Sequence, residues 1–172
     1  ISVPWDGESS GELQCRGNWI ASTYYNDERA GESFTEDGWL RTGDVAAVDA
    51  RGRIRLLDRT KDLIKSGGEW ISSVDLENHI VGVPGVAQAC VVAQPHPKWD
   101  ERPVALIVVE SGKEVTQEQV LAHCESAFAK WQLPDEVLYI DAIPLTSTGK
   151  MDKKVVRADL DAKGYQLPSL RS

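Results

Sequence analysis

Two neighbouring segments near the middle of the chain hold residue types suited to binding a phosphate-bearing ligand. They are Asp58-Arg59-Thr60-Lys61-Asp62 and Lys65-Ser66-Gly67-Gly68-Glu69-Trp70. Arginine offers a permanent charge and a planar fork of donors, which suits ribose or phosphate oxygens. Adjacent glycines permit positive φ and let the backbone approach a ligand closely. The same composition also fits a solvated hairpin with surface ion pairs, so the pattern alone leaves both interpretations open.

Two further segments contain residues that could act on the same kind of ligand. Thr42-Gly43-Asp44 places a carboxylate after a glycine, and a carboxylate can accept hydrogen bonds from ribose hydroxyls. Thr146-Ser147-Thr148-Gly149-Lys150 places a lysine on a stem of small residues, where its ammonium group could neutralise charge that develops on a phosphate. Taken singly, the first fits a turn aspartate and the second a mobile surface loop.

The distribution of charge points to a small anion rather than a polymer. The net charge of −8 argues against a general nucleic-acid binder. Residues 51–65 nevertheless carry six bases against two acids, whereas residues 1–50 carry ten acids and three bases. A local basic stretch in an acidic protein suits a phosphate group, although charge runs are more often solvated faces.

Length and composition predict a protein of the soluble globular class. The 172 residues are enough for one good core, or for one small domain and part of another. The longest apolar runs are far shorter than a membrane span, and the start of the chain lacks the features of a signal peptide. Beginning at Ile1 rather than Met suggests a fragment, a processed product or a chain whose front is not shown.

Cysteine usage fits a cytoplasmic location. Cys15, Cys90 and Cys124 are scattered, and their spacing is not that of metal ligands. Cys90 and Cys124 lie in apolar patterns, so we expect both to be buried free thiols.

The first sixty residues predict β-structure. Residues 12–17 indicate a short strand that ends in a glycine turn, and residues 45–57 indicate a β-hairpin around Ala50-Arg51-Gly52. In its second strand, Ile54 and Leu56 share one face and arginines the other, which is the alternation of a half-buried strand.

After residue 60 the pattern becomes mixed helix and strand. Ser72 with Asp75, and Thr116 with Gln119, have the spacing of helix starts. Apolar residues at helical spacing extend the second of these helices as far as Phe128. The other expected elements are strands over 86–93, 104–109 and 137–140 and a last helix over 153–160. The domain boundary therefore falls near residues 58–62, between a β-rich part too small to stand alone and a compact α+β unit.

Taken together, in their order and spacing, these motifs resemble the closing third of an acyl-adenylate-forming enzyme. The form Ser-Gly-Gly-Glu-Trp-Ile is most similar to medium- and long-chain fatty-acyl-CoA synthetases. The resemblance implies an α+β fold in two parts. Residues 1–60 would be the end of the large domain's distorted β-barrel, and residues 61–172 the small C-terminal lid domain.

The resemblance also assigns roles in nucleotide chemistry. Asp44 matches the carboxylate that holds the AMP ribose, and Arg59 matches the arginine that contacts the nucleotide. Lys61, two residues later, matches the hinge between the large and small domains. Lys150 matches the catalytic lysine of the adenylation step.

A second group of roles concerns CoA. By resemblance, Gly67 and Gly68 line the CoA channel and face the active site in the thioester-forming state. Lys65, Glu69 and Trp70 are further candidates for contact with the adenylate or with CoA. His96-Pro97-Lys98-Trp99-Asp100-Glu101-Arg102-Pro103 resembles another family stretch, in which we expect structural roles for His96, Glu101 and Arg102.

The implied substrates are a fatty acid, ATP and CoA, with Mg²⁺ bound by residues outside this chain. The implied partners are an upstream large domain of the same protein and, as a further option, a second copy in a homodimer, with no nucleic acid and no transmembrane segment. In family members the phosphate-binding loop and the acyl pocket lie further upstream, so we expect this chain alone to be inactive. Ligation of another acid, loading of a carrier protein, and a stand-alone module that binds CoA, a nucleotide or a protein are the alternatives.

Overall fold

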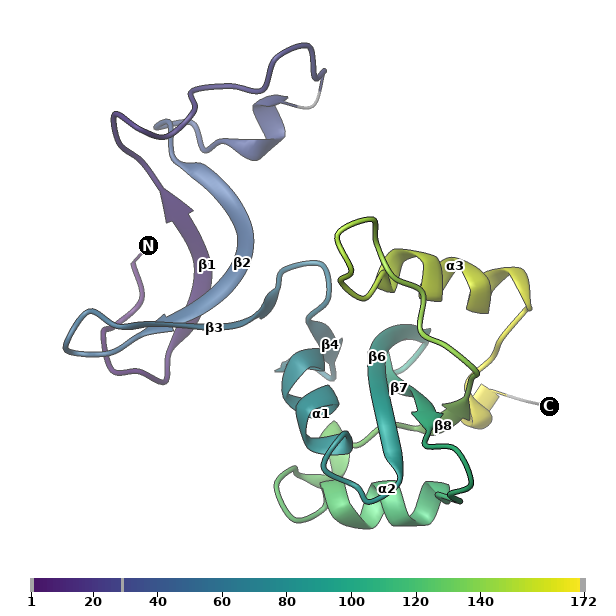
Figure 1. Cartoon of the computed structure of the whole chain (residues 1–172). Helices are drawn as coiled ribbons and strands as arrows, with labels where there is room; N and C mark the ends of the chain where they lie inside the picture. The colour runs from purple at the N-terminus through teal and green to yellow at the C-terminus, as the bar shows by residue number, and fades with distance from the viewer. Residues whose placement is uncertain (1, 29, 171–172) are drawn as a thin grey trace. The chain divides into compact units, whose positions relative to one another are not determined.

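The chain divides into two compact units in the computed structural model, which describes residues 2–28 and 30–170. The first unit spans Ile1–Lys61 and the second Asp62–Ser172. Each unit has its own sheet (Figure 1).

The first unit is a three-stranded antiparallel sheet with the strand order β1-β2-β3. Its elements are β1 (Ser10–Cys15), the 3₁₀ helix η1 (Ala30–Ser33), β2 (Leu40–Val48) and β3 (Ile54–Arg59). The Asp49 carboxylate organises the turn between β2 and β3, because it accepts hydrogen bonds from the backbone N–H groups of Arg51 and Arg53, at 2.9 and 3.0 Å. The strand near residue 12 and the hairpin are therefore as the sequence predicts.

The expectation that β3 is half-buried is wrong for this unit. Ile54 and Leu56 share a face, but they are 55% and 63% exposed. Among the described residues of this unit, the buried apolar side chains are Val45, Ala46 and Ala47 on the central strand β2, and the buried residue of β3 is the polar Asp58. β3 is an edge strand, and the described side chains of this unit leave its apolar face uncovered.

The second unit is built on a mixed five-stranded sheet. Its strands are β4 (Ile64–Ser66), β5 (Glu69–Ile71), β6 (Val86–His96), β7 (Asp100–Val109) and β8 (Glu136–Tyr139). The order is β5-β4-β7-β6, and β8 pairs in parallel with β7. The helices are α1 (Ser73–Ile80), α2 (Gln117–Cys124) and α3 (Lys153–Ala162), with 3₁₀ turns η2 (Lys130–Gln132) and η3 (Pro168–Leu170).

Side-chain caps define where the three helices begin. The Ser72 hydroxyl accepts a hydrogen bond from the Asp75 N–H at the start of α1. Thr116 and Gln119 form the predicted reciprocal capping box of α2. The Asp152 carboxylate caps α3 by accepting a hydrogen bond from the Val155 N–H. Each cap satisfies an N–H group that has no partner inside its helix, so these boundaries follow from local sequence.

The sheet is covered by helices on both faces (Figure 1). Ala89 and Val91 of β6 pack in a core with α1 and α2, whereas Cys90 and Val92 pack in a second core with α3. Successive strand residues point to opposite faces, so one strand serves both cores. The α+β fold is confirmed, and Cys90 and Cys124 are buried free thiols as predicted.

The helix expected to reach Phe128 ends earlier. α2 stops at Cys124, and the Cys124 carbonyl accepts hydrogen bonds from the N–H groups of Ala127 and Phe128. Apolar spacing continues because Phe128 still packs against the core from the turn that follows. Periodicity therefore reports which side chains face the core, not where the helix ends.

Candidate functional site

The two residues predicted to bind the nucleotide, Asp44 and Arg59, lie opposite one another in the first unit. They are paired residues of β2 and β3, and Arg59 Nε lies 3.2 Å from Asp44 Oδ1. The Gly43 carbonyl accepts a hydrogen bond from the Thr60 N–H at 2.9 Å, which closes the strand pair beyond them. Because both side chains remain partly solvent-accessible, this ion pair adds little stability and either group can exchange its partner for a ligand.

Lys61, the predicted hinge, is the last residue of the first unit. Its side chain is exposed, whereas that of Asp62 is buried in the second unit. Asp62 Oδ1 accepts a hydrogen bond from Arg157 Nη1 on α3 at 3.0 Å. The second unit therefore begins with an anchored residue directly after an exposed one.

Gly67 and Gly68 form the two-residue turn of the β4–β5 hairpin. Their φ angles are +61° and +90°, a conformation that suits glycine and matches the twist of a tight hairpin. A β-carbon on Gly67 would lie 3.1 Å from Cε3 of Trp99. Gly67 N–H also donates to the Trp99 carbonyl at 2.9 Å. Gly67 is thus required both for its backbone angle and for close contact with an indole ring.

The β6–β7 turn that carries Trp99 is organised by His96. His96 Nδ1 accepts hydrogen bonds from the N–H groups of Lys98 and Trp99, at 3.1 and 3.2 Å. Glu101 next to this turn accepts a hydrogen bond from the Lys65 N–H at 2.9 Å. The structural roles expected for His96 and Glu101 are consistent with these contacts, because His96 orders its own turn and Glu101 joins that turn to the β4–β5 hairpin.

A pocket of about 420 Å³ lies beside the two hairpins. Its walls are Ser66, Gly67, Glu69, His96, Trp99, Arg102, Trp131, Asp135 and Ser169. The indoles of Trp99 and Trp131 give it aromatic surface, and Glu69 adds a carboxylate. Of the five residues predicted to face CoA, only Gly67 and Glu69 line this pocket.

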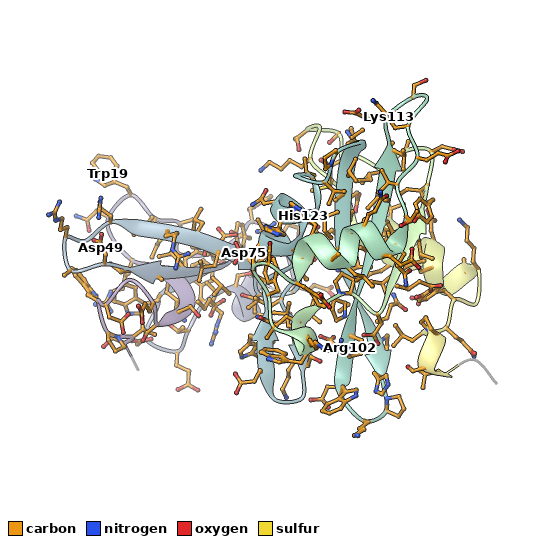
Figure 2. The ribbon with its side chains drawn as sticks, turned by 90° about the horizontal axis from the view of Figure 1, so that it is seen from below. Trp19, Asp49, Asp75, Arg102, Lys113 and His123 are labelled. Carbon is orange, nitrogen blue, oxygen red and sulfur yellow. The ribbon has the colours of Figure 1, made fainter. Side chains whose placement is uncertain are left out.

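Arg102 is the hub of the pocket wall. It donates to the Asp135 carboxylate at 2.6 and 2.8 Å, to Ser66 Oγ at 2.9 Å, and to the backbone carbonyls of Trp131 and Leu133. Figure 2 labels Arg102, which is 9% exposed. Its donors are committed to protein oxygens, so its guanidinium shapes the pocket and is not available to a ligand phosphate.

The other predicted CoA-facing residues lie around the hairpin. Lys65 Nζ is 3.7 Å from the Asp100 carboxylate, and both side chains are exposed. Trp70 is paired with Lys65 across the hairpin and is 57% exposed. These two side chains are open to solvent.

Lys150 lies on a different hairpin, between β8 and α3. Thr146 and Lys150 are joined by a 2.7 Å backbone hydrogen bond, and Leu145 pairs with Met151. Gly149 has a φ of +79° and an exposed position at the tip. The segment is therefore a hydrogen-bonded hairpin at the surface, and it presents the Lys150 side chain to solvent.

Comparison with known families finds a match within the second unit. Residues 75–150 match the family model "AMP-binding enzyme C-terminal domain". Residues 75–150 belong to this domain family, and the chain as a whole is similar to acyl-adenylate-forming enzymes. The family match begins inside α1 and ends on Lys150, and it covers β6, β7, α2 and β8 completely. The predicted resemblance is confirmed.

Curated relatives extend the similarity to most of the chain. The chain is 53% identical, over 157 residues, to a long-chain-fatty-acid–CoA ligase of Thermus thermophilus, covering 90% of this chain and 29% of that protein. It is 41% identical to a medium-chain-fatty-acid–CoA ligase of Ectopseudomonas oleovorans, covering 91% of this chain and 28% of the relative. The chain therefore spans less than a third of the length of these two relatives.

Solved structures show the same fold. ATP-bound MatB from Rhodopseudomonas palustris matches with a TM-score of 0.82 and 29% identity, over 89% of this chain and 31% of that one. The o-succinylbenzoate CoA synthetase MenE of Bacillus subtilis, in complex with its acyl-adenylate intermediate, matches with a TM-score of 0.79 and 31% identity, over 88% and 31%.

Sequence analysis missed three residues of the pocket wall, Trp131, Asp135 and Ser169. Trp131 and Asp135 belong to the segment between α2 and β8, which contacts Arg102 at the pocket. A tryptophan in a short polar segment before Pro134 was the available signal. The partner of a buried arginine more than thirty residues away leaves no local pattern.

Two negative findings apply to the part of the chain that the structure describes. No helix in residues 2–28 and 30–170 is long and apolar enough to cross a membrane. Over the same residues, no cluster of three or more His, Cys, Asp or Glu side chains could hold a metal ion.

Proposed function

We propose that this chain is the C-terminal portion of a fatty-acid–CoA ligase that forms an acyl-adenylate and then an acyl-CoA thioester. One observation carries the proposal. A lysine and a glycine turn, the two groups expected to serve the two half-reactions, lie at the tips of two separate hairpins of one compact unit. Similarity to fatty-acid–CoA ligases over 90% of the chain supports the same conclusion.

The first half-reaction joins the acid to AMP. A carboxylate oxygen of the fatty acid attacks the α-phosphorus of ATP, the bond to the β-phosphate breaks, and pyrophosphate leaves. In this proposal Asp44 accepts hydrogen bonds from the ribose hydroxyls and Arg59 contacts the nucleotide. Lys150 places its ammonium beside the α-phosphate, where it stabilises negative charge that increases in the transition state.

The second half-reaction releases AMP. The CoA thiolate attacks the acyl carbon, and the bond to the adenylate oxygen breaks. We propose that the second unit turns about Lys61 between the two steps, which withdraws Lys150 and presents Gly67 and Gly68. A hinge is a backbone position that absorbs a dihedral change, and an exposed residue between two compact units suits that role.

The pocket beside Gly67 suits part of CoA. Aromatic side chains provide stacking surfaces for a nucleobase, and Trp99 and Trp131 line this pocket. We propose that it receives the adenine ring while the pantetheine arm passes Gly67 and Gly68. Lys65, Glu69 and Trp70 are candidates for the contacts around the opening.

Other parts of the proposal lie outside this chain. ATP would enter with Mg²⁺, and no residue of this chain is assigned to the metal. The acid pocket and the phosphate-binding loop are proposed for an upstream domain of the same protein. Three free cysteines fit a reducing, cytoplasmic compartment.

The decisive test is Lys150→Ala in the full-length protein. Loss of one preorganised charge predicts a fall of about 100- to 1,000-fold in acid-dependent ATP–pyrophosphate exchange. Thioester formation from supplied acyl-AMP should change far less. Lys154→Ala, an exposed lysine on the following helix, is the matched control. Equal losses in both half-reactions would refute the assignment.

The identity of the acid is tested separately. Relatives include a 3-methylmercaptopropionyl-CoA ligase of Ruegeria pomeroyi that is 45% identical over 91% of this chain. Full-length enzyme should be assayed with acids of graded chain length and with a carrier protein in place of CoA. Preference for a medium or long fatty acid and free CoA supports the proposal, whereas preference for a carrier protein overturns its second step.

A further inference from the structure

A buried ion pair joins two helices of the second unit. Lys153 Nζ lies 2.8 Å from Glu77 Oε1 and donates a 2.6 Å hydrogen bond to Ser73 Oγ. The side chains of Lys153 and Glu77 are only 10% and 6% exposed. Burying two charges is unfavourable unless their geometry is good and their remaining hydrogen bonds are made, so these positions are tightly constrained.

This ion pair connects helices on the two faces of the sheet, at the edge formed by β6. Glu77 belongs to α1, and Lys153 is the first residue of α3, two helices that pack on opposite faces of the sheet (Figure 1). β6 is the last strand on that side, and Glu77 Oε1 also accepts the Val91 N–H of β6 at 2.7 Å. One carboxylate therefore binds the strand edge and the start of α3 together.

The start of α3 is also the base of the hairpin that carries Lys150. Met151 pairs with Leu145, and the Asp152 N–H donates to the Pro144 carbonyl at 2.8 Å. Only these two residues, both tied to the opposite arm of the hairpin, separate Lys150 from Lys153. Displacement of Lys153 would thus be transmitted to Lys150 through a hydrogen-bonded segment.

A second tether fixes the direction of α3. Arg157 lies one turn after Lys153 on the same side of the helix, and it binds Asp62, the residue that follows Lys61. Two attachments on one helix define its axis, whereas one would leave it able to pivot. The N-terminal end of α3 is consequently set by α1 and by the first residue of the unit.

We infer that Lys153, held by Glu77 and Ser73, is a positioning residue for Lys150 in the adenylation step. The inference rests on the proposed function, which places Lys150 beside the α-phosphate. Glu77 and Lys153 do not touch substrate; they hold the hairpin base so that the Lys150 ammonium meets the phosphate. A displacement of about 1 Å in a reacting group can lower a rate about 100-fold, which makes such support effective.

The test uses a double variant of the full-length enzyme, Glu77→Gln with Lys153→Met. A single substitution would leave one charge buried without its partner and could unfold the protein. In the double variant the glutamine oxygen still accepts from the Val91 N–H, and methionine fills the space of the lysine stem. Circular dichroism and the melting temperature establish that the variant is folded at the assay temperature.

The double variant should impair the adenylation half-reaction and leave the thioester-forming half-reaction nearly unchanged. ATP–pyrophosphate exchange should fall by about 10- to 100-fold, with thioester formation from supplied acyl-AMP within about threefold of wild type. Lys154→Met, the same substitution at the exposed neighbouring residue, is the matched control and should leave both rates unchanged. Equal losses in both half-reactions, or unchanged exchange in a folded double variant, would overturn the inference.

The same assays separate this inference from the proposed function. If Lys150→Ala splits the half-reactions and the double variant does not, only the positioning role fails. If Lys150→Ala itself shows no split, the role of Lys150 fails and the positioning role fails with it.

Discussion

The second unit presents two glycine-containing hairpins that are built in opposite ways. The turn at Gly67 is packed, with Trp99 filling the space that a β-carbon would need. The tip at Gly149 is open, because no heavy atom lies within 4 Å of the position of an added β-carbon. The first hairpin is fixed at its tip and the second at its base, through Lys153.

This difference fits the two proposed tasks. A narrow channel for the pantetheine arm needs a precisely shaped backbone, which close packing of Gly67 supplies. A lysine that must reach a phosphate needs an unobstructed tip and a firm base. Substitutions at the two hairpins should therefore affect different half-reactions and to different extents.

The largest expected effect in this comparison is that of Gly67→Ala. The new methyl group would meet the Trp99 ring at 3.1 Å and would require a positive φ, so both the turn and the indole must shift. We expect thioester formation from supplied acyl-AMP to fall about 100-fold and pyrophosphate exchange to change little. Gly68→Ala, where no atom lies within 4 Å, should have a smaller effect. Equal effects at the two positions would show that packing against Trp99 is unimportant.

Trp131→Ala should have an intermediate effect. Stacking of a base on an aromatic side chain is worth about 1–3 kcal/mol, so KM for CoA should rise about tenfold while pyrophosphate exchange stays constant. Trp70→Ala sharpens the comparison, because Trp70 lies on the same hairpin as Gly67 but outside the pocket. A larger effect of Trp70→Ala would place the CoA site outside this pocket.

Gly149→Ala should have a milder effect, confined to the other half-reaction. Its added methyl group meets open space, so the penalty is backbone strain at a φ of +79°, about 1–2 kcal/mol. Exchange of pyrophosphate should fall about tenfold at most, with thioester formation unaffected. Ser147→Ala in the same turn is the control. A loss in thioester formation would contradict the division of labour between the hairpins.

The smallest expected effect concerns the alkylation of cysteines in the two hydrophobic cores of the second unit. Burial raises the pKa of the Cys90 thiol to about 12 and that of the Cys124 thiol to about 11. Both should resist alkylation at pH 8, while half-buried Cys15 reacts first. Because Cys90 lies on the α3 side and Cys124 on the α1–α2 side, mass spectrometry of slow labelling shows which side opens first.

The raised pKa values of the buried thiols also set the direction in which stability changes with pH. An unfolded thiol ionises near 9.0, whereas Cys90 in the folded state holds its proton to about 12. Above pH 9 the folded state therefore binds more protons than the unfolded chain, and stability falls as pH rises. The drop in melting temperature from pH 8 to pH 10 should be smaller in Cys90→Ala. An unchanged drop would show that this thiol does not contribute.

Local sequence patterns were reliable where a few neighbouring residues decide the outcome. Ser72 and the Thr116–Gln119 pair marked helix starts because a cap needs only nearby N–H groups. The apolar patterns around Cys90 and Cys124 predicted burial for the same local reason. The order of the motifs was enough for the family, which the comparison confirmed.

Patterns failed where the outcome depended on what covers a surface. Ile54 and Leu56 alternate with arginines as a half-buried strand does, yet they are exposed in the first unit. Alternation shows that two side chains share a face, but it carries no information about whether another layer packs there. Sequence patterns also failed to predict that Trp131 and Asp135 line the pocket. Their hydrogen bonds to Arg102 join segments that are far apart in the chain.

The sequence by itself determined the family, the α+β class, the helix starts and the identity of the candidate residues, because each depends on residue type and short spacing. Only the tertiary structure decided that Asp44 faces Arg59, that Trp99 packs on Gly67, and that Lys153 reaches Ser73 across 80 positions of the chain. The physical reason is that strand register and the packing of helices on a sheet bring together groups whose separation along the chain leaves no periodic signal.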